Sequence, residues 1–388
     1  SSTIPPEEIL RTLRIICINL AMQFPLGFYL GGLMGLQKQV LVNVVRVLAA
    51  TAGGAGAVFV IWKISPTAWA FFSWQAAVMV VQVASATVLL WAILPGRTGK
   101  PRFDFRLFRR EWRFAAGMSC ISISALVLTQ MDKVVLSRIL SLTSFGYYTL
   151  AGVVSSGLYV FIAPVFGAVF PRFSALVAVR DEKELLLLYH RGAQFMAVLV
   201  LPAASVLALF SGEILLLWTN NREIALAAAP LVSALTLGTA LNGLMHLPYA
   251  LQLAYGWTRI AVMINLFLIA VLLPATVFLA KTFGAVGGAS AWALLNIVYV
   301  IVGVPLTHRR VLKGESLRWF KEDLLLPAAG ALGIAFIGRM LPTESMSPVA
   351  TVVFLSLLLL GSGIAAAIVT PHTRAWLLES GLFPGASK

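Results

Sequence analysis

Charged residues are scarce in this sequence. Asp, Glu, Lys and Arg make up 11% of its 388 residues, whereas a soluble domain usually carries about 25%. Apolar side chains make up 60%, and the mean hydropathy is +0.91. A soluble fold of this length would have almost no polar surface to turn toward water, but a lipid bilayer solvates apolar surface directly. The composition therefore excludes a soluble enzyme and indicates an integral membrane protein.

The residues that build most chemical sites are scarce as well. The two cysteines, Cys17 and Cys120, both lie within apolar runs, which indicates small core residues rather than a disulfide framework or a metal site. The four histidines form no HExxH motif, and neither CxxC nor GxxxxGKS/T occurs. Since these motifs carry common metal and phosphate chemistry, we expect no catalytic residue, no metal and no cofactor.

The apolar residues come in long, continuous runs. Runs of about 20 apolar residues predict transmembrane helices, whereas the strands of a membrane barrel would alternate apolar and polar residues. About eleven spans are predicted. They cover residues 12–35, 40–62, 68–93, 114–137, 144–170, 192–218, 225–254, 258–281, 285–307, 323–341 and 347–370. Several contain a proline, which membrane helices tolerate because neighbouring helices satisfy the freed carbonyl groups. The sequence thus predicts an all-α integral membrane fold.

The loops between these spans differ in their content of Lys and Arg. One side carries Lys38, Arg46, Arg259, Arg374, Lys388 and the basic runs within 97–113, 172–191 and 309–321. The other side carries Arg11, Arg14, Lys63, Lys133, Arg138, Arg222, Lys281 and Arg339. The more basic side is expected to be cytoplasmic. We therefore expect the chain to start outside and to end inside, and we read the net charge of +14 as an insertion signal rather than as nucleic-acid binding.

A short internal repeat relates two parts of the chain. Each copy has a proline within a span, a glycine turn with a basic residue, and an asparagine in the next span. The two series are Pro25, Gly35, Lys38 and Asn43, and Pro248, Gly256, Arg259 and Asn265. An even number of spans separates the copies, as in the parallel repeats of transporters. If each half holds six helices, residues 1–93 are a partial first lobe, and three earlier spans are expected.

Four segments carry a family resemblance. They are Tyr29 to Lys38 (YLGGLMGLQK), Gln130 to Ser137 (QMDKVVLS), Phe145 to Ala151 (FGYYTLA) and Phe170 to Ser174 (FPRFS). With them the sequence resembles the polysaccharide transporter family, the flippases of O-antigen and exopolysaccharide units, within the multidrug/oligosaccharidyl-lipid/polysaccharide exporter superfamily. The resemblance follows the order of the spans over nearly the whole chain and is sharpest from residue 130 to residue 174.

The resemblance implies both a fold and a function. The fold has two six-helix lobes around a V-shaped cavity, followed by two C-terminal helices, so that the present spans are the fourth to the fourteenth. The parts are then a partial N-terminal lobe (1–93), a basic cytoplasmic linker (94–113), a C-terminal lobe (114–307), two further spans (308–370) and a cytoplasmic tail (371–388). The function is to move an undecaprenyl-diphosphate-linked oligosaccharide across the bacterial cytoplasmic membrane by alternating access.

Such a transporter needs cations for the diphosphate and a hydrated cavity for the sugar. Ionisable residues within spans are costly and are usually functional, so Asp132, Lys133 and Arg138 are candidates for phosphate binding or ion coupling. Because Asp132 lies near the end of its span, an interfacial ion pair is the alternative. Arg46 would meet the diphosphate at the inner leaflet, or extend to the membrane surface.

Neutral polar residues within spans are the candidates for sugar binding. These are Gln23, Tyr29, Asn242, His246 and Gln252. Asn242 and His246 are four residues apart and share a helix face. The alternative is that these side chains form hydrogen bonds between helices and hold the bundle together.

Other functions remain open at this point. A multidrug antiporter of the same superfamily would need acidic cavity residues, and the chain has 15 acids in all. A lipid II flippase, and a membrane polymerase or ligase of polysaccharide, are further alternatives. The expected partners are a lipid-linked oligosaccharide, membrane lipids, a coupling proton or sodium ion and polysaccharide assembly proteins.

Overall fold

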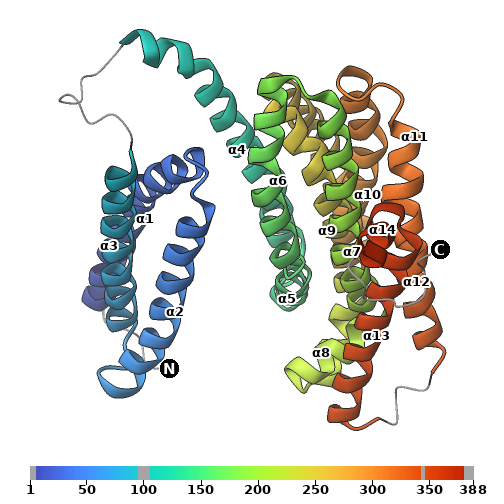
Figure 1. Cartoon of the computed structure of the whole chain (residues 1–388). Coiled ribbons are helices and arrows are strands. Elements are labelled where there is room, and N and C mark those ends of the chain that lie inside the picture. Colours follow the sequence, from blue (N-terminus) through green and yellow to red (C-terminus); the bar gives the residue numbers. More distant parts are fainter. Residues whose placement is uncertain (1–5, 95–104, 342–345, 380–388) are drawn as a thin grey trace. The chain divides into compact units, whose positions relative to one another are not determined.

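The computed structural model describes residues 6–94, 105–341 and 346–379. Within these ranges the regular structure is entirely helical (Figure 1). The chain divides into two compact units, Ser1–Phe103 and Asp104–Lys388, and each is described by itself. Nine helices among the described residues are long and apolar enough to cross a membrane. The predicted all-α membrane fold is therefore confirmed.

The first unit holds three long helices: α1 (Pro6–Gly35), α2 (Gln39–Lys63) and α3 (Ala68–Ile93). Their apolar faces meet in a small core, which is made up of Leu30, Leu33, Val42, Val45, Ala86 and Leu90. Most other apolar side chains of these helices are exposed, as is expected where lipid rather than water is the solvent.

The second unit contains the rest of the described helices. Its first part comprises α4 (Phe105–Ile139), α5 (Leu142–Ser156), α6 (Tyr159–Val179), α7 (Glu182–Leu209), α8 (Ser211–Thr219), α9 (Arg222–Ala254) and α10 (Thr258–Arg310). Its second part comprises α11 (Ser316–Arg318), the π-helix η1 (Trp319–Leu325), α12 (Leu326–Arg339), α13 (Pro348–Val369) and α14 (Pro371–Glu379). The main core lies where α6, α7 and α9 pack together, and α12 and α13 pack on α7.

The long element α10 is interrupted at Gly284. This residue has φ 60° and ψ −139°, a conformation that is essentially restricted to glycine. The chain reverses direction there, and two contacts between the arms show it. A Cβ at Gly287 would lie 2.0 Å from the carbonyl oxygen of Leu279 on the preceding arm. Leu268 of the first arm also packs in one cluster with Leu295 of the second. The two arms correspond to the predicted spans 258–281 and 285–307.

A side chain at this glycine is expected to destabilise the protein. Gly284→Ala should lower the free energy of unfolding by about 1–3 kcal/mol through backbone strain alone, since no atom lies within 4 Å of the added Cβ. Gly333→Ala in α12 is the matched control, because its Cβ would also meet open space but in a helical backbone. Thermal unfolding of the detergent-solubilised protein by circular dichroism measures the difference. Equal unfolding temperatures for the two variants would contradict the expectation.

Some predicted spans have different boundaries in the structure. The predicted span 144–170 consists of α5 and α6, which are separated at Gly157 and Leu158. The predicted span 192–218 consists of α7 and α8, and α7 begins earlier because the Asp181 side chain accepts a hydrogen bond from the Glu184 amide at 3.0 Å. Half of the predicted linker 94–113, residues 95–104, and the end of the predicted tail, residues 380–388, lie outside the described residues.

The two copies of the predicted repeat have the same turn geometry. Each turn places one residue in the left-handed region, Gln37 (φ 56°) in one and Gly256 (φ 70°) in the other. In each, the next amide donates to the carbonyl five residues back at 2.9 Å, from Lys38 to Leu33 and from Trp257 to Gln252. This pattern ends a helix sharply. The matching positions are Gln37 with Gly256 and Lys38 with Trp257, which is two residues out of the register that pairs Gly35 with Gly256. The geometry is a common way to end a helix, and the repeat stays a prediction from the sequence.

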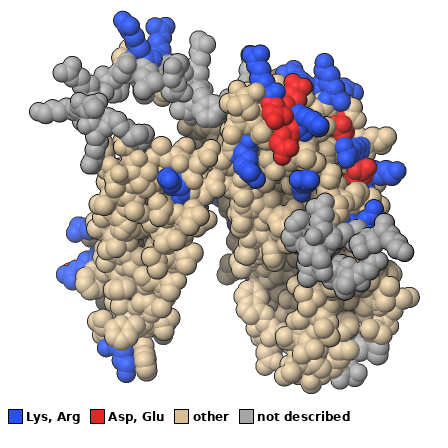
Figure 2. Space-filling view, viewed as in Figure 1, with Lys and Arg blue, Asp and Glu red and all other residues tan. Residues whose placement is uncertain are grey.

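Charged side chains gather at one end of the second unit. Figure 2 shows them where α6 meets α7 and where α10 meets α11, above a surface that is mostly uncharged. Exposed residues there include Arg180, Lys183, Arg309, Arg310 and Lys313. We refer to this as the basic end. It belongs to the side that the sequence predicts to be cytoplasmic.

Candidate functional site

Two adjoining cavities lie within the helices of the second unit. The first, of about 240 Å³, is lined by Asn242, Asn265 and Asn296 among others, and we call it the asparagine cavity. The second, of about 510 Å³, is lined by Asp132 and Lys133 among others, and we call it the aspartate cavity. Three residues line both cavities: Thr129, Tyr159 and Trp292.

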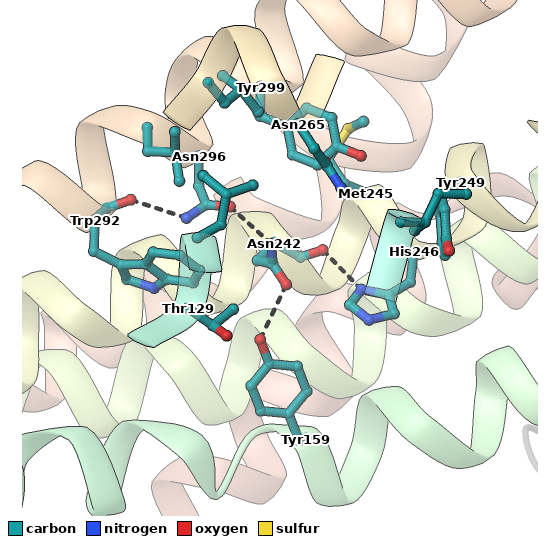
Figure 3. A pocket seen from close by; sticks show the side chains of 14 residues that line it. Thr129, Tyr159, Asn242, Met245, His246, Tyr249, Asn265, Trp292, Asn296 and Tyr299 are labelled. Carbon is teal, nitrogen blue, oxygen red and sulfur yellow. Dashed lines mark hydrogen bonds between the residues drawn. The ribbon is translucent and has the colours of Figure 1, made fainter. Parts of the chain in front are cut away.

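Asn242 of α9 is the centre of the polar network in the asparagine cavity (Figure 3). Tyr159 Oη donates to Asn242 Oδ1 at 3.0 Å, and Asn242 Nδ2 donates to Asn296 Oδ1 at 2.9 Å. Asn296 Nδ2 in turn donates to the Trp292 carbonyl oxygen at 2.9 Å. Since each amide both donates and accepts, this chain fixes the orientation of Asn242 and links α6, α9 and α10.

His246 lies one turn along α9 from Asn242. Its Nδ1–H donates to the Asn242 carbonyl oxygen at 2.9 Å, because a carbonyl oxygen can only accept. Nε2 of the neutral ring is then an acceptor. Edge-to-face contacts with Tyr159 and Phe166, at centroid distances of 6.1 and 5.9 Å, hold the ring in place. The predicted pairing of residues 242 and 246 on one face is present.

Aromatic rings form much of the remaining wall. Tyr249, Trp292 and Tyr299 line the asparagine cavity. The Trp292 indole N–H donates to Thr239 Oγ1 at 3.2 Å, and Gly238 makes room for the ring, because a Cβ there would lie 2.4 Å from Trp292 Cδ1. Among the side chains that the structure describes, no Asp, Glu, Lys or Arg lines this cavity. Amides, hydroxyls and aromatic faces without a charge suit a neutral ligand rich in hydroxyl groups.

The aspartate cavity contains the predicted pair Asp132 and Lys133, but the two side chains do not bond to each other. Tyr148 Oη donates to Asp132 Oδ2, while Lys133 Nζ donates to Gln130 Oε1 at 3.0 Å. Adjacent residues on a helix point in different directions, which separates the two groups. Asp132 Oδ1 is buried and has no hydrogen-bond partner among the described residues.

Two other candidates of the second unit lie away from both cavities. Arg138 is exposed in the last turn of α4 and lines neither of them. Gln252 is buried, and its Nε2 donates to Thr307 Oγ1 at 2.7 Å, which ties α9 to α10. Gln252 thus forms a hydrogen bond between helices, which was the alternative to sugar binding in the sequence analysis.

Three candidates belong to the first unit. Gln23 and Arg46 are exposed, and Tyr29 is half-buried, packing beside the Leu30 and Leu33 core. Neither cavity described above extends into this unit. The roles proposed for these three residues therefore rest on the sequence.

Sequence reasoning missed several residues of the asparagine cavity. Tyr159 begins α6 just after the break at Gly157, so its orientation could not be read from one continuous span. Asn296 and Trp292 lie on one face of α10, four residues apart, and a search for polar residues at helical spacing in the predicted span 285–307 would have found them.

Two comparisons relate this chain to known proteins. A family described as "Polysaccharide biosynthesis protein" matches residues 13–221 of the chain. A protein of Shigella flexneri described as a "Putative O-antigen transporter" is 24% identical over 196 residues, which are 50% of this chain and 46% of that protein. The chain thus spans about half the length of the curated relative that it matches. The matched family region includes Asp132, Lys133 and Tyr159.

Proposed function

We propose, from the premise that this chain belongs to the polysaccharide biosynthesis protein family, that it carries an undecaprenyl-diphosphate-linked oligosaccharide across the bacterial cytoplasmic membrane by alternating access. The similarity to an O-antigen transporter supports a transport role. No covalent bond of the substrate is formed or broken in such a step, so the proposed role is that of a transporter and not of an enzyme. Its chain starts outside and its C-terminus is cytoplasmic.

The asparagine cavity is the observation that carries this proposal. It lies among helices that are long and apolar enough to cross a membrane, yet its wall presents the amides of Asn242, Asn265 and Asn296 and the hydroxyls of Tyr159 and Thr129. Polar groups are costly inside a membrane and face cavities or one another. A sugar, with hydroxyls that both donate and accept, satisfies such groups.

The aspartate cavity supplies the cation that a diphosphate requires. Lys133 lines it beside the hydroxyls of Thr129, Thr149 and Ser156. A Lys ammonium binds phosphate as a point charge with three donors. We propose that Lys133 contacts the diphosphate, with Arg138 and Arg46 as further cations on its path. Asp132, with one oxygen unpartnered, remains the candidate for coupling to a proton or a sodium ion.

Complementation tests the proposal. The complete gene product is expressed in a bacterium that lacks its own O-antigen flippase, and surface polysaccharide is measured beside the amount of protein in the membrane. We expect the parent to restore polysaccharide and Lys133→Ala to reduce it at least tenfold at equal protein level. Because Arg138 is exposed outside both cavities, Arg138→Ala is expected to have the smaller effect.

Other outcomes would favour the alternatives. A well-expressed parent that restores nothing, but gives resistance in a drug-export assay of the same strain, would replace the proposal with a multidrug antiporter. A parent that restores chain length in a strain lacking its polymerase would indicate an enzyme of polysaccharide assembly. Full activity of Lys133→Ala would remove this residue from the diphosphate path.

A further inference from the structure

A buried polar cluster lies at the basic end of the second unit, away from both cavities. His190 and Gln194 of α7 meet Asp323 of η1 and Glu315, the residue before α11. His190 and Asp323 are each 1% exposed, and Gln194 is fully buried. Buried charges are costly unless they are paired and hydrogen-bonded, so this cluster requires a physical account.

Both ring nitrogens of His190 face a carboxylate. Nδ1 lies 2.6 Å from Asp323 Oδ2, and Nε2 lies 3.1 Å from Glu315 Oε2. A neutral imidazole has one N–H, and an ionised carboxylate can only accept. In a neutral ring between two ionised carboxylates, one ring nitrogen carries no proton. That nitrogen and the carboxylate oxygen facing it would both be acceptors, and no hydrogen bond could form between them. The geometry is satisfied when the cluster binds one additional proton, either on the ring, so that both ring nitrogens donate, or on a carboxyl that donates to the bare nitrogen. An imidazole is ordinarily the more basic of the two groups, which favours the ring.

The fold brings these groups together through an unusual local structure. Asp323 belongs to a seven-residue π-helix, a widened turn that is rare in proteins and is often found at functional sites. Its second oxygen, Oδ1, accepts from Gln194 Nε2 at 2.8 Å. The side-chain amide oxygen of Gln194, Oε1, accepts a hydrogen bond from the backbone amide of His372, near the start of α14, at 2.8 Å. A continuous chain of hydrogen bonds thus runs from His190 to α14.

Other ionisable groups surround the cluster, and their hydrogen-bond partners are mostly outside it. Arg318 donates to Glu322 at 3.0 Å and lies 3.8 Å from Glu315. From α10, His308 Nε2 pairs with Tyr189 Oη at 2.8 Å. From α14, burial, with the Arg318 charge as the second cause, lowers the pKa of His372 below its ordinary value.

A further ionisable neighbour is Arg191 of α7, which is exposed and affects His372 by its charge. With His190 as an imidazolium, one positive ring faces the two carboxylates of Asp323 and Glu315, and Arg318 partly offsets the remaining negative charge.

We propose that this cluster is a proton-binding site, in which a buried His190 imidazolium is clamped between Asp323 and Glu315 and holds η1 and α14 against α7. The proton is the ligand, and its role is structural. Glu315, with its side chain 23% exposed, is the member through which the proton exchanges with solution. The proposal does not depend on the substrate that the protein carries.

The state of the histidines tests this directly. The chain has four histidines, so selective ¹⁵N-histidine labelling of the detergent-solubilised full chain gives a spectrum simple enough to assign, with His190→Gln identifying the His190 signals. We expect two protonated ring nitrogens with imidazolium shifts for His190 at neutral pH, while His246, which bonds through Nδ1 alone, shows one. A His190 ring with one bare nitrogen would overturn the proposal.

Hydrogen exchange tests the clamp in the same preparation. His190→Gln is expected to speed backbone exchange in α14 about tenfold, because the anchor of Asp323 and therefore of Gln194 is lost. Tyr189→Phe is the matched control: it removes the neighbouring bond to His308 but leaves the chain to α14 intact, and it should not change exchange there. Unchanged exchange in His190→Gln would refute the clamp.

Discussion

Replacing Asp323 by alanine is expected to lower the free energy of unfolding by about 3–5 kcal/mol, the usual effect of removing one partner of a buried ion pair. The carboxylate accepts from His190 at 2.6 Å and from Gln194 at 2.8 Å, and alanine leaves both donors buried without partners. Reversible unfolding in mixed detergent micelles, followed by circular dichroism, measures the loss.

An apolar replacement of the three buried members separates the cost of an orphaned partner from the value of the pair. Leucine at positions 190, 194 and 323 together should recover part of the lost stability, since exchanging a buried ion pair for apolar groups is often neutral or stabilising. Recovery is expected to be incomplete, because the His372 amide then loses its acceptor, Gln194 Oε1. A triple variant less stable than Asp323→Ala would show that the cluster itself, and not the orphaned partners, accounts for the effect.

Replacing Asn242 by leucine is expected to reduce transport at least tenfold while the protein still reaches the membrane. Leucine has the same branched outline, although it is larger, and it cannot accept from Tyr159 or donate to Asn296, so the polar wall of the asparagine cavity loses its centre. Surface polysaccharide in the complementation strain, divided by the amount of protein in the membrane, is the measurement.

Gln252→Leu is the matched control for this variant. Gln252 is a buried amide on the same helix, and its bond to Thr307 lies outside the cavity. Its loss should reduce the amount of folded protein without changing the activity per molecule. Equal activity per molecule for Asn242→Leu and the parent would exclude the asparagine cavity as the sugar site.

The helices could be predicted because their signal is local. A run of apolar residues such as 68–93 forms a span wherever its neighbours lie, and α3 has these bounds in the structure. The break at Gly157 was not predicted, because the three residues Ser155, Ser156 and Gly157 are too short an interruption to divide a long apolar run in a hydropathy window. The early start of α7 was not predicted either, since a window of hydropathy gives little weight to a capping residue such as Asp181.

The candidate site was predictable only where residues share a helix. Asn242 and His246 were found by their spacing on α9, but their partners come from α6 and α10, and no pattern within one span shows which helices will meet. The same limit applies to His190 and Asp323, which are 133 residues apart and lie at the edges of predicted spans. There a sequence pattern cannot distinguish a buried pair from two solvated charges.

Trp292 walls both cavities, and this gives the two compartments a thermodynamic relation. The ring is held by Thr239 and fits against Gly238, so one side chain forms part of the wall of each cavity. If a ligand in one cavity displaces this ring, the shape of the other cavity changes with it. By linkage, each ligand would then change the affinity for the other by the same factor, and we expect binding to the two cavities to need measurement together.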